Sequence, residues 1–185
     1  MFNLINVLTV IFLLSSSALA NDRAPWKYQD WQVEDGDIGF IASTNGKAVH
    51  GHSFGIMMPK GSCNKNILVL SLSSTEEDVR TLLNKEVSFE FKAYHRTYPA
   101  KIKLIYINDS LPITKILGFN FVQLSDEFIE DLKYGEELSV EIMDNYGLFG
   151  FKEEFFSLNG FVANYTKLVE SCKDIEQLNI PPSIK

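Results

Sequence analysis

The chain has 185 residues, with 17 Lys and Arg against 24 Asp and Glu, so its formal net charge at pH 7 is −7. This acidic balance argues against binding to nucleic acids or to anionic membrane surfaces, because both attract proteins through Lys and Arg. A chain of this length, with 45% hydrophobic residues, can bury a core of its own. We therefore expect a single domain whose net negative charge favours solubility.

The start of the chain has the pattern of a secretory signal peptide. An apolar run over 4–14 is broken by serines, and Ala18 and Ala20 place small residues where a signal peptidase needs them. The first residues carry no Lys or Arg, so an uncleaved membrane anchor is the alternative. That apolar run of about 11 residues is shorter than the roughly 20 that cross a bilayer. We expect cleavage after Ala20, one exported β-rich domain over 21–180 with no stable membrane span, and a tail over 181–185.

Alternating apolar residues and turn signals predict strands along most of the remaining chain. An acidic turn separates the first two strands, and Asn45-Gly46 suggests a tight type I′ hairpin before the third. The fourth is an almost continuous apolar run, typical of a central strand. The expected strands cover 31–33, 38–43, 53–58, 67–72, 87–91, 100–107, 116–122, 138–143 and 148–156.

Three short helices are expected between and after these strands. Ser74 and Glu77 have the spacing of a capping box, and Ser125 is placed to cap a second helix that ends at Gly135. A third helix follows Asn159-Gly160 and reaches Cys172.

These elements do not alternate long helices with strands, which excludes a doubly wound parallel sheet. The sequence instead predicts a mainly β (α+β) domain. We expect an antiparallel β-sandwich or half-barrel of about eight short strands, with two or three short helices that include a C-terminal one.

Cys63 and Cys172 are the only cysteines of the chain. In an exported protein the default interpretation is a disulfide between them. A redox-active pair is the alternative, but the chain has no Cys-x-x-Cys spacing to support it.

Three segments resemble the invasion-associated locus B family of bacterial proteins. Residues 28–33, Tyr-Gln-Asp-Trp-Gln-Val, are similar to that family's Gly-Asp-Trp-x-Val opening. Residues 124–138 resemble its short helix, Lys-x-Gly turn and following strand, and 156–161 with Leu168 resemble its Ser-Leu-x-Gly-Phe ending. The position of Cys172 after the last helix also resembles small periplasmic accessory proteins of type VI secretion.

The resemblance implies a bacterial periplasmic or secreted protein linked to host interaction or secretion. It supplies no catalytic residue and no cofactor. The chain departs from the family pattern where Glu34 and Asp35 follow the opening motif in place of a cysteine, and residues 85–115 match poorly.

The histidines suggest one possible metal site. In His50-Gly51-His52 the two rings would share one face of a strand, as two metal ligands require, and Asp35 or Asp37 could complete the set. Surface or hairpin histidines explain the same pattern without a metal. A metal-dependent envelope enzyme is therefore kept as an alternative function.

Aromatic residues in two strand connections suggest a binding surface. Tyr94, Arg96 and Tyr98 lie in one connection, and Tyr146 and Phe149 lie in another. Tyr, Phe and Arg are frequent anchors of protein interfaces, and the two connections would form a binding tip if they met at one end of the domain. The alternative is that these aromatic residues fill the core.

The chain has no Gly-x-Ser-x-Gly motif, no Ca²⁺-binding loop and no other clear catalytic pattern. We therefore expect a non-enzymatic module that binds an envelope or host protein and needs no cofactor. An inhibitor of a secreted hydrolase is a further alternative, which the sequence does not separate from the first.

Overall fold

The computed structural model describes residues 24–111, 113–144 and 146–178. The expected signal peptide with its cleavage at Ala20, and the expected tail over 181–185, lie outside the described residues. None of the helices in the described part has the length and apolar character needed to span a membrane.

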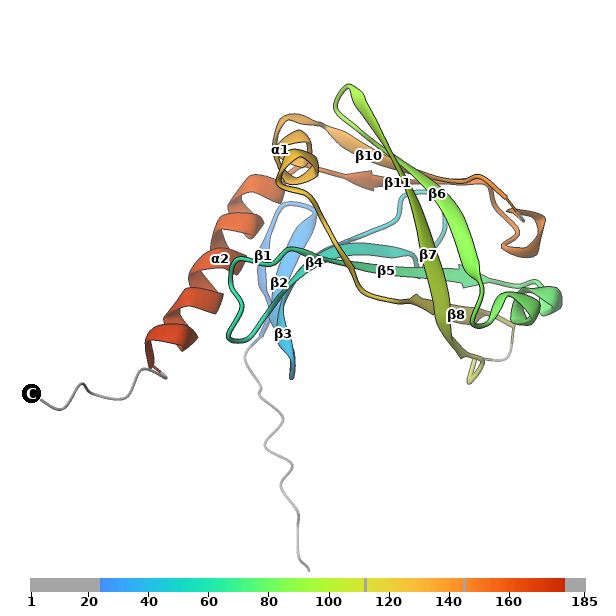
Figure 1. Ribbon diagram of the computed structural model, residues 1–185, viewed down its shortest axis with the longest axis horizontal. Coiled ribbons are helices and arrows are strands. Elements are labelled where there is room, and N and C mark those ends of the chain that lie inside the picture. Colours follow the sequence, from blue (N-terminus) through green and yellow to red (C-terminus); the bar gives the residue numbers. More distant parts are fainter. Residues whose placement is uncertain (1–23, 112, 145, 179–185) are drawn as a thin grey trace, which may run out of the picture.

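One antiparallel sheet forms the body of the described chain (Figure 1). Its eleven strands are ordered β1-β2-β3-β4-β5-β8-β7-β6-β10-β11, and β9 also pairs with β5. The strands are β1 (Trp26–Tyr28), β2 (Trp31–Asp35), β3 (Gly39–Asn45), β4 (Ser53–Pro59), β5 (Ile67–Ser74), β6 (Glu86–Ala93), β7 (Arg96–Asn108), β8 (Lys115–Phe119), β9 (Val122–Gln123), β10 (Glu137–Ile142) and β11 (Glu153–Ser157).

The open sheet curls into a half-barrel, which is one of the two architectures that the sequence predicts. One layer contains β2 to β5 and β8, the other contains β6, β10 and β11, and the long β7 crosses between them (Figure 1). A bridge between Gly46 and Phe156 brings β11 back to the segment that follows β3. The strand number exceeds the expected eight mainly because β1 and β9 have only three and two residues, too few to show an alternating pattern.

Aromatic side chains from both layers fill the space between them. Phe54 of β4 lies 5.8 Å from Phe156 of β11, measured between ring centroids, and Phe89 of β6 meets Phe119 of β8 at 5.3 Å. All four rings are buried. The alternative hypothesis, that the aromatic residues fill the core, is thus correct for most of the described phenylalanines.

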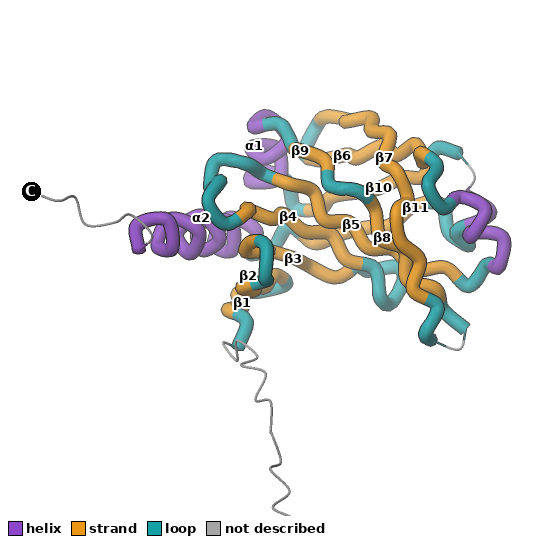
Figure 2. Tube along the Cα trace, turned by 60° about the horizontal axis from the view of Figure 1, so that its bottom comes forward, coloured by secondary structure: helices purple, strands orange, loops and turns teal. Residues whose placement is uncertain are grey.

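Helices cover the ends of the curled sheet. The segments are the 3₁₀ helices η1 (Glu77–Leu82) and η2 (Tyr146–Leu148) and the α-helices α1 (Asp126–Tyr134) and α2 (Phe161–Leu178). As predicted, the Ser125 side chain caps α1 by accepting a hydrogen bond from the Phe128 amide at 3.2 Å. Figure 2 shows α2 lying along one end of the sheet, where it contacts β1 to β4.

Two local predictions are wrong. Ser74 and Glu77 do not form a capping box, because the Ser74 hydroxyl accepts from the Glu76 amide before η1 begins. Asn45-Gly46 does not form a two-residue hairpin, because the chain continues as a loop to β4. That loop turns toward β11, where Gly46 lies so close to Glu154 that a Cβ atom would be 2.7 Å from its carboxyl carbon.

The predicted disulfide is present. Cys63 follows β4 and Cys172 lies in α2, with 5.6 Å between their Cα atoms and a sequence separation of 109. The bond therefore joins the C-terminal helix to the connection between β4 and β5.

Replacing Cys63 and Cys172 together by Ala should lower the free energy of unfolding by up to about 4–5 kcal/mol, because the bond removes the entropy of a long loop from the unfolded chain. Urea denaturation of the oxidised protein and the double variant measures the difference. A loss below about 1 kcal/mol would show that the bond does not constrain the unfolded chain in this way.

Candidate protein-binding groove

The predicted metal ligand His52 is fully buried and takes part in a structural contact. Its Nδ1 atom lies 2.6 Å from Glu154 Oε2, and its Nε2 atom lies 3.2 Å from the Ser73 carbonyl oxygen. The Glu154 carboxylate also accepts hydrogen bonds from the amides of Ala48 and Val49 at 2.7 and 2.9 Å. His52 thus connects Glu154 of β11 with Ser73 of β5, and Glu154 holds the loop after β3 against β11.

The structure does not bring the three predicted metal ligands together. His50 is exposed, and Asp35 pairs with the Lys60 ammonium group at 2.8 Å. Within the described ranges, no cluster of three or more His, Cys, Asp and Glu side chains is arranged to hold a metal ion.

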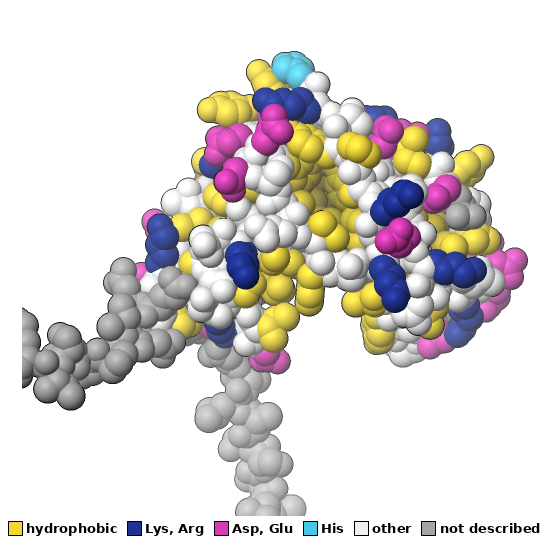
Figure 3. All heavy atoms as spheres, in the orientation of Figure 1, with side chains coloured by type: hydrophobic (Ala, Val, Ile, Leu, Met, Phe, Trp, Pro, Cys, Tyr) yellow, Lys and Arg dark blue, Asp and Glu magenta, His cyan; other side chains and the backbone are white. Residues whose placement is uncertain are grey.

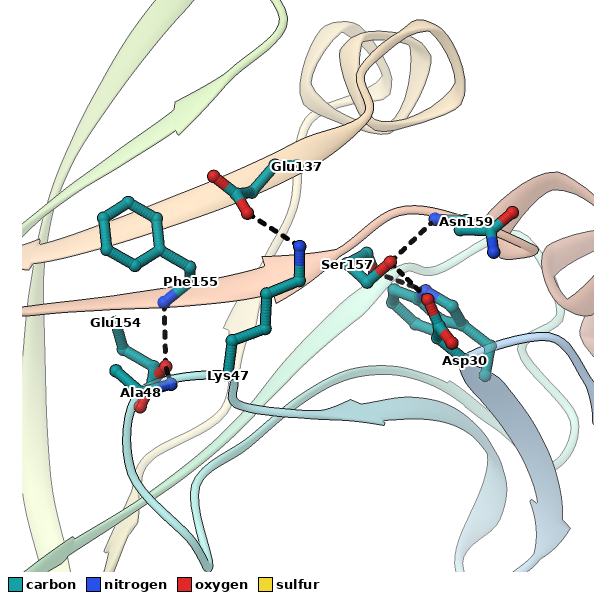
Figure 4. A network of polar contacts seen from close by, with 9 residues as sticks. Asp30, Lys47, Ala48, Glu137, Glu154, Phe155, Ser157 and Asn159 are labelled. Carbon is teal, nitrogen blue, oxygen red and sulfur yellow. Dashed lines mark hydrogen bonds and ion pairs between the residues drawn. The ribbon is translucent and has the colours of Figure 1, made fainter.

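We refer to the contact of β3 and its following loop with β11 as the seam. A polar pocket of about 440 Å³ lies beside it, and Figure 4 shows Asp30, Lys47 and Ser157, which line this pocket. The Ser157 hydroxyl donates to Asp30 Oδ2 at 2.5 Å and accepts from the Asn159 amide at 3.2 Å. Lys47 pairs with Glu137 at 2.7 Å. No histidine lines this pocket, so the Ser157–Asp30 pair lacks the base of a hydrolytic triad, and its contacts hold the seam together.

The two aromatic connections lie at opposite ends of β6 and β10. In the pairing of these strands Leu138 is opposite Ala93, next to Tyr94, whereas Ile142 is opposite Phe89 at the other end. The single binding tip considered from the sequence is therefore not formed.

The members of that proposed tip also differ in exposure. Tyr146 is half exposed, but Phe149 is 1% exposed and packs on Phe151 as part of the core. Tyr94, Arg96 and Tyr98 do lie together, on the hairpin between β6 and β7 and at the start of β7.

Next to this hairpin the sheet opens into an apolar hollow. The second half of β7 pairs with β8, while the first half follows β6 and diverges from β8. The chain after β8 stays on β5 as β9 and then enters α1. In Figure 1, β7 and the segment before α1 diverge. Figure 3, in the same orientation, shows hydrophobic side chains in the hollow between them.

We refer to this hollow as the β7 groove. Its volume is about 210 Å³, and the ten residues that line it come from β5, β6, β7, the segment from β9 to the N-cap of α1, and α1 itself. Those that make its apolar surface include Leu68, Phe91, Tyr98, Pro99, Ala100, Val122, Leu124 and Phe128.

Contacts with α1 fix the upper wall of the β7 groove. The Tyr98 ring packs edge-on against Phe128, with 4.8 Å between centroids, and its hydroxyl donates to Asp131 Oδ2 at 2.5 Å. Arg96 forms ion pairs with Glu127 and Asp131. Burial, followed by the hydrogen bond to Asp131, raises the pKa of Tyr98 from 10.0 to about 12.

Of the residues that the sequence singled out, only Tyr98 lines the β7 groove, and Tyr94 and Arg96 precede it on the same hairpin. Tyr94, Arg96 and Tyr98 carried a signal because aromatic residues and Arg are typical of interfaces. Val122 and Leu124 gave no such signal, since their apolar pattern is the same whether the neighbouring strand position is filled or open.

Replacing His52 by Ala should lower the free energy of unfolding by about 3–5 kcal/mol, because it takes away the side-chain hydrogen-bond partner of the buried Glu154 carboxylate and leaves a cavity. As a matched comparison, Lys47→Ala breaks the exposed pair with Glu137 and should cost less than about 1 kcal/mol. Urea denaturation of both variants measures the two losses. Equal losses would contradict the structural role of His52.

The raised pKa of Tyr98 predicts a dependence of stability on alkaline pH. The folded protein keeps a phenol proton that the unfolded chain releases near pH 10, so this contribution is present below about pH 10 and is lost as the pH rises toward about 12. Between about pH 9 and about pH 11, the free energy of unfolding should fall less for Tyr98→Phe than for the unmodified protein. Tyr94→Phe, at an exposed ring, should behave like the unmodified protein.

Comparison with known proteins supports the fold. No protein-family model matches the chain, and no curated protein matches it. The crystal structure of invasion associated protein B from Bartonella henselae is similar, with a TM-score of 0.50 and 11% sequence identity over 81% of this chain and 99% of that chain. Identity at this level reports on the fold alone. The resemblance expected from the sequence is thus confirmed in structure: the chain has a fold similar to that of invasion associated protein B.

Proposed function

We propose that this chain is a non-enzymatic module, periplasmic or secreted in a bacterium, that binds an envelope or host protein through the β7 groove. The observation that carries the proposal is the groove itself, an apolar hollow that is open at the surface and has exposed aromatic side chains near it. Open apolar patches with a polar rim are typical of protein-binding surfaces. The disulfide and the likeness to invasion associated protein B are consistent with an extracytoplasmic location.

The surroundings of the β7 groove support binding of a protein. Tyr94 and Tyr134 are 54% and 69% exposed and lie 6.1 Å apart at the hairpin end, and Phe121, which directly precedes β9, is 56% exposed. Exposed aromatic rings around a small apolar hollow resemble the few residues that carry most of the energy of an interface. A partner side chain of the size of Val or Leu that enters the hollow would contribute roughly 1.5–3 kcal/mol through burial.

The chemistry elsewhere gives less support to the enzymatic alternative. His52 and Glu154 are buried together, and Ser157 is tied to Asp30 at the seam. Both groups have their hydrogen-bonding capacity used by the fold. An inhibitor of a secreted hydrolase would be one form of the proposed module, recognised by the identity of its partner.

A photo-crosslinking amino acid placed at Tyr94 should capture a protein partner in the producing cells, whereas the same group at Tyr146 should not. Both positions are about half exposed, but Tyr146 lies in the connection at the opposite end of β6 and β10 from Tyr94. Mass spectrometry identifies the captured protein. Equal capture at both positions, or capture at Tyr146 alone, would contradict the proposal.

A matched pair of variants then tests the groove directly. Val122→Glu places a carboxylate in the β7 groove and should abolish capture from Tyr94, because a buried charge without a partner is costly. Val162→Glu, at an exposed position of α2, should leave capture unchanged. Thermal unfolding of both variants confirms that they fold.

A further inference from the structure

The first half of β7 has a free backbone edge beside the groove. Ala93 and Arg96 are paired across the two-residue turn between β6 and β7, so Arg96, Tyr98 and Ala100 direct their N–H and C=O groups toward β6. The intervening residues direct theirs to the other side. Lys103 shows this alternation, because its amide donates to Asn120 Oδ1 and its carbonyl accepts from the Asn120 amide, both at 2.9 Å.

On the N-terminal side of Lys103, the outer edge of β7 has no partner strand within the described chain. The outer groups of Thr97, Pro99 and Lys101 form no hydrogen bond with any other described residue. They comprise the N–H and C=O of Thr97 and Lys101 and the C=O of Pro99, whose ring nitrogen carries no hydrogen. The pairing of β7 with β8 begins only at Leu104, so a strand position next to these residues is empty.

The empty position opens onto the β7 groove. Tyr98 and Ala100 of β7 line the groove with Pro99 between them, while Thr97 and Lys101, which alternate with Tyr98 and Ala100 along the strand, are exposed. A strand added to this edge would follow the same alternation. Every second side chain would enter the apolar groove, and the others would lie beside Lys101 on the outer surface.

The charges along this edge favour an acidic occupant over a second copy of the chain. Arg96 is paired with acidic residues of α1, whereas Lys101 and Lys103 have no ion-pair partner within the described part of the chain. Two copies meeting edge to edge would bring these lysines together, and lysine and proline on an edge strand oppose such pairing. Acidic side chains on another protein would instead face unpaired ammonium groups.

We propose that the β7 groove binds an extended peptide segment of the partner protein, which adds as a strand to the outer edge of β7 between Thr97 and Lys101. Its alternate side chains are apolar, to fill the groove, and acidic, to face Lys101 and Lys103. This inference rests on the proposed function and names the conformation and chemistry of the bound segment. Main-chain hydrogen bonds give such a complex affinity, and the alternating side chains give it specificity.

The heptapeptide Val-Glu-Val-Glu-Val-Glu-Val tests this inference on the purified, disulfide-bonded protein. Hydrogen exchange measured by NMR should slow by at least about tenfold at the amides of Thr97 and Lys101, which gain partners. The amides of Tyr98 and Ala100, already bonded to β6, serve as internal references. The heptapeptide Val-Lys-Val-Lys-Val-Lys-Val has the same alternation with the opposite charge and should not bind.

Two substitutions at one position separate the backbone contact from the charge. Lys101→Ala keeps the amide and should weaken binding of the acidic heptapeptide by no more than about fivefold, as expected for an exposed charge pair. Lys101→Pro removes the outer N–H as well, and should weaken binding more than about tenfold. Proline is tolerated on the outer side of an edge strand, and Pro99 already occupies such a position in β7.

The outcomes distinguish this inference from the proposed function. If the acidic heptapeptide does not bind, or binds without slowing exchange at Thr97 and Lys101, strand addition is wrong. A second outcome is that the crosslinker at Tyr94 still captures a partner, that Val122→Glu abolishes this capture, and that Lys101→Pro does not change it. In that case the binding function stands and strand addition is again wrong. Slowed exchange together with loss of binding in Lys101→Pro supports the inference.

Discussion

The change of partner along β7 is the constraint on which the architecture depends. Each edge of a strand can pair with one neighbour at a time, and β7 uses its second edge for β8 only from Leu104 onward. The bulge between Leu104 and Tyr106 lies at that point and turns the strand from one layer to the other. The two layers can then face each other across the aromatic core, and the same divergence leaves the first half of β7 with an open edge.

The opposite side of the half-barrel is closed by buried polar contacts. Glu154 binds the loop after β3 through backbone amides and through His52, and Trp31 donates its indole N–H to the Ser157 carbonyl at 2.7 Å. These contacts satisfy backbone groups that the short bridge between Gly46 and Phe156 would leave unpaired. One side of the curled sheet is therefore held closed, while the other side stays open at the β7 groove.

The proposed function follows from this asymmetry. His52, which the sequence suggested as a metal ligand, instead stabilises the closed side through its hydrogen bond with Glu154. The open side offers apolar side chains and main-chain groups without partners, which are the two features that recognise an extended peptide. Tyr98 connects the two wall elements, because its ring packs on Phe128 while its hydroxyl binds Asp131 of α1.

The sequence by itself determined the mainly antiparallel class, most strand positions, the cap of α1 at Ser125 and the disulfide between Cys63 and Cys172. These features depend on local alternation, on residues a few positions apart, or on there being only two cysteines. Only the tertiary structure decided that His52 lies against Glu154, that Phe149 belongs to the core and that Tyr94 and Tyr146 lie at opposite ends. It also decided that Val122 and Leu124 face Ala100 across a groove. The physical reason is that period-two alternation tells which side of a strand is buried, but not which strand lies beside it, and strand neighbours are set by contacts between residues far apart in sequence.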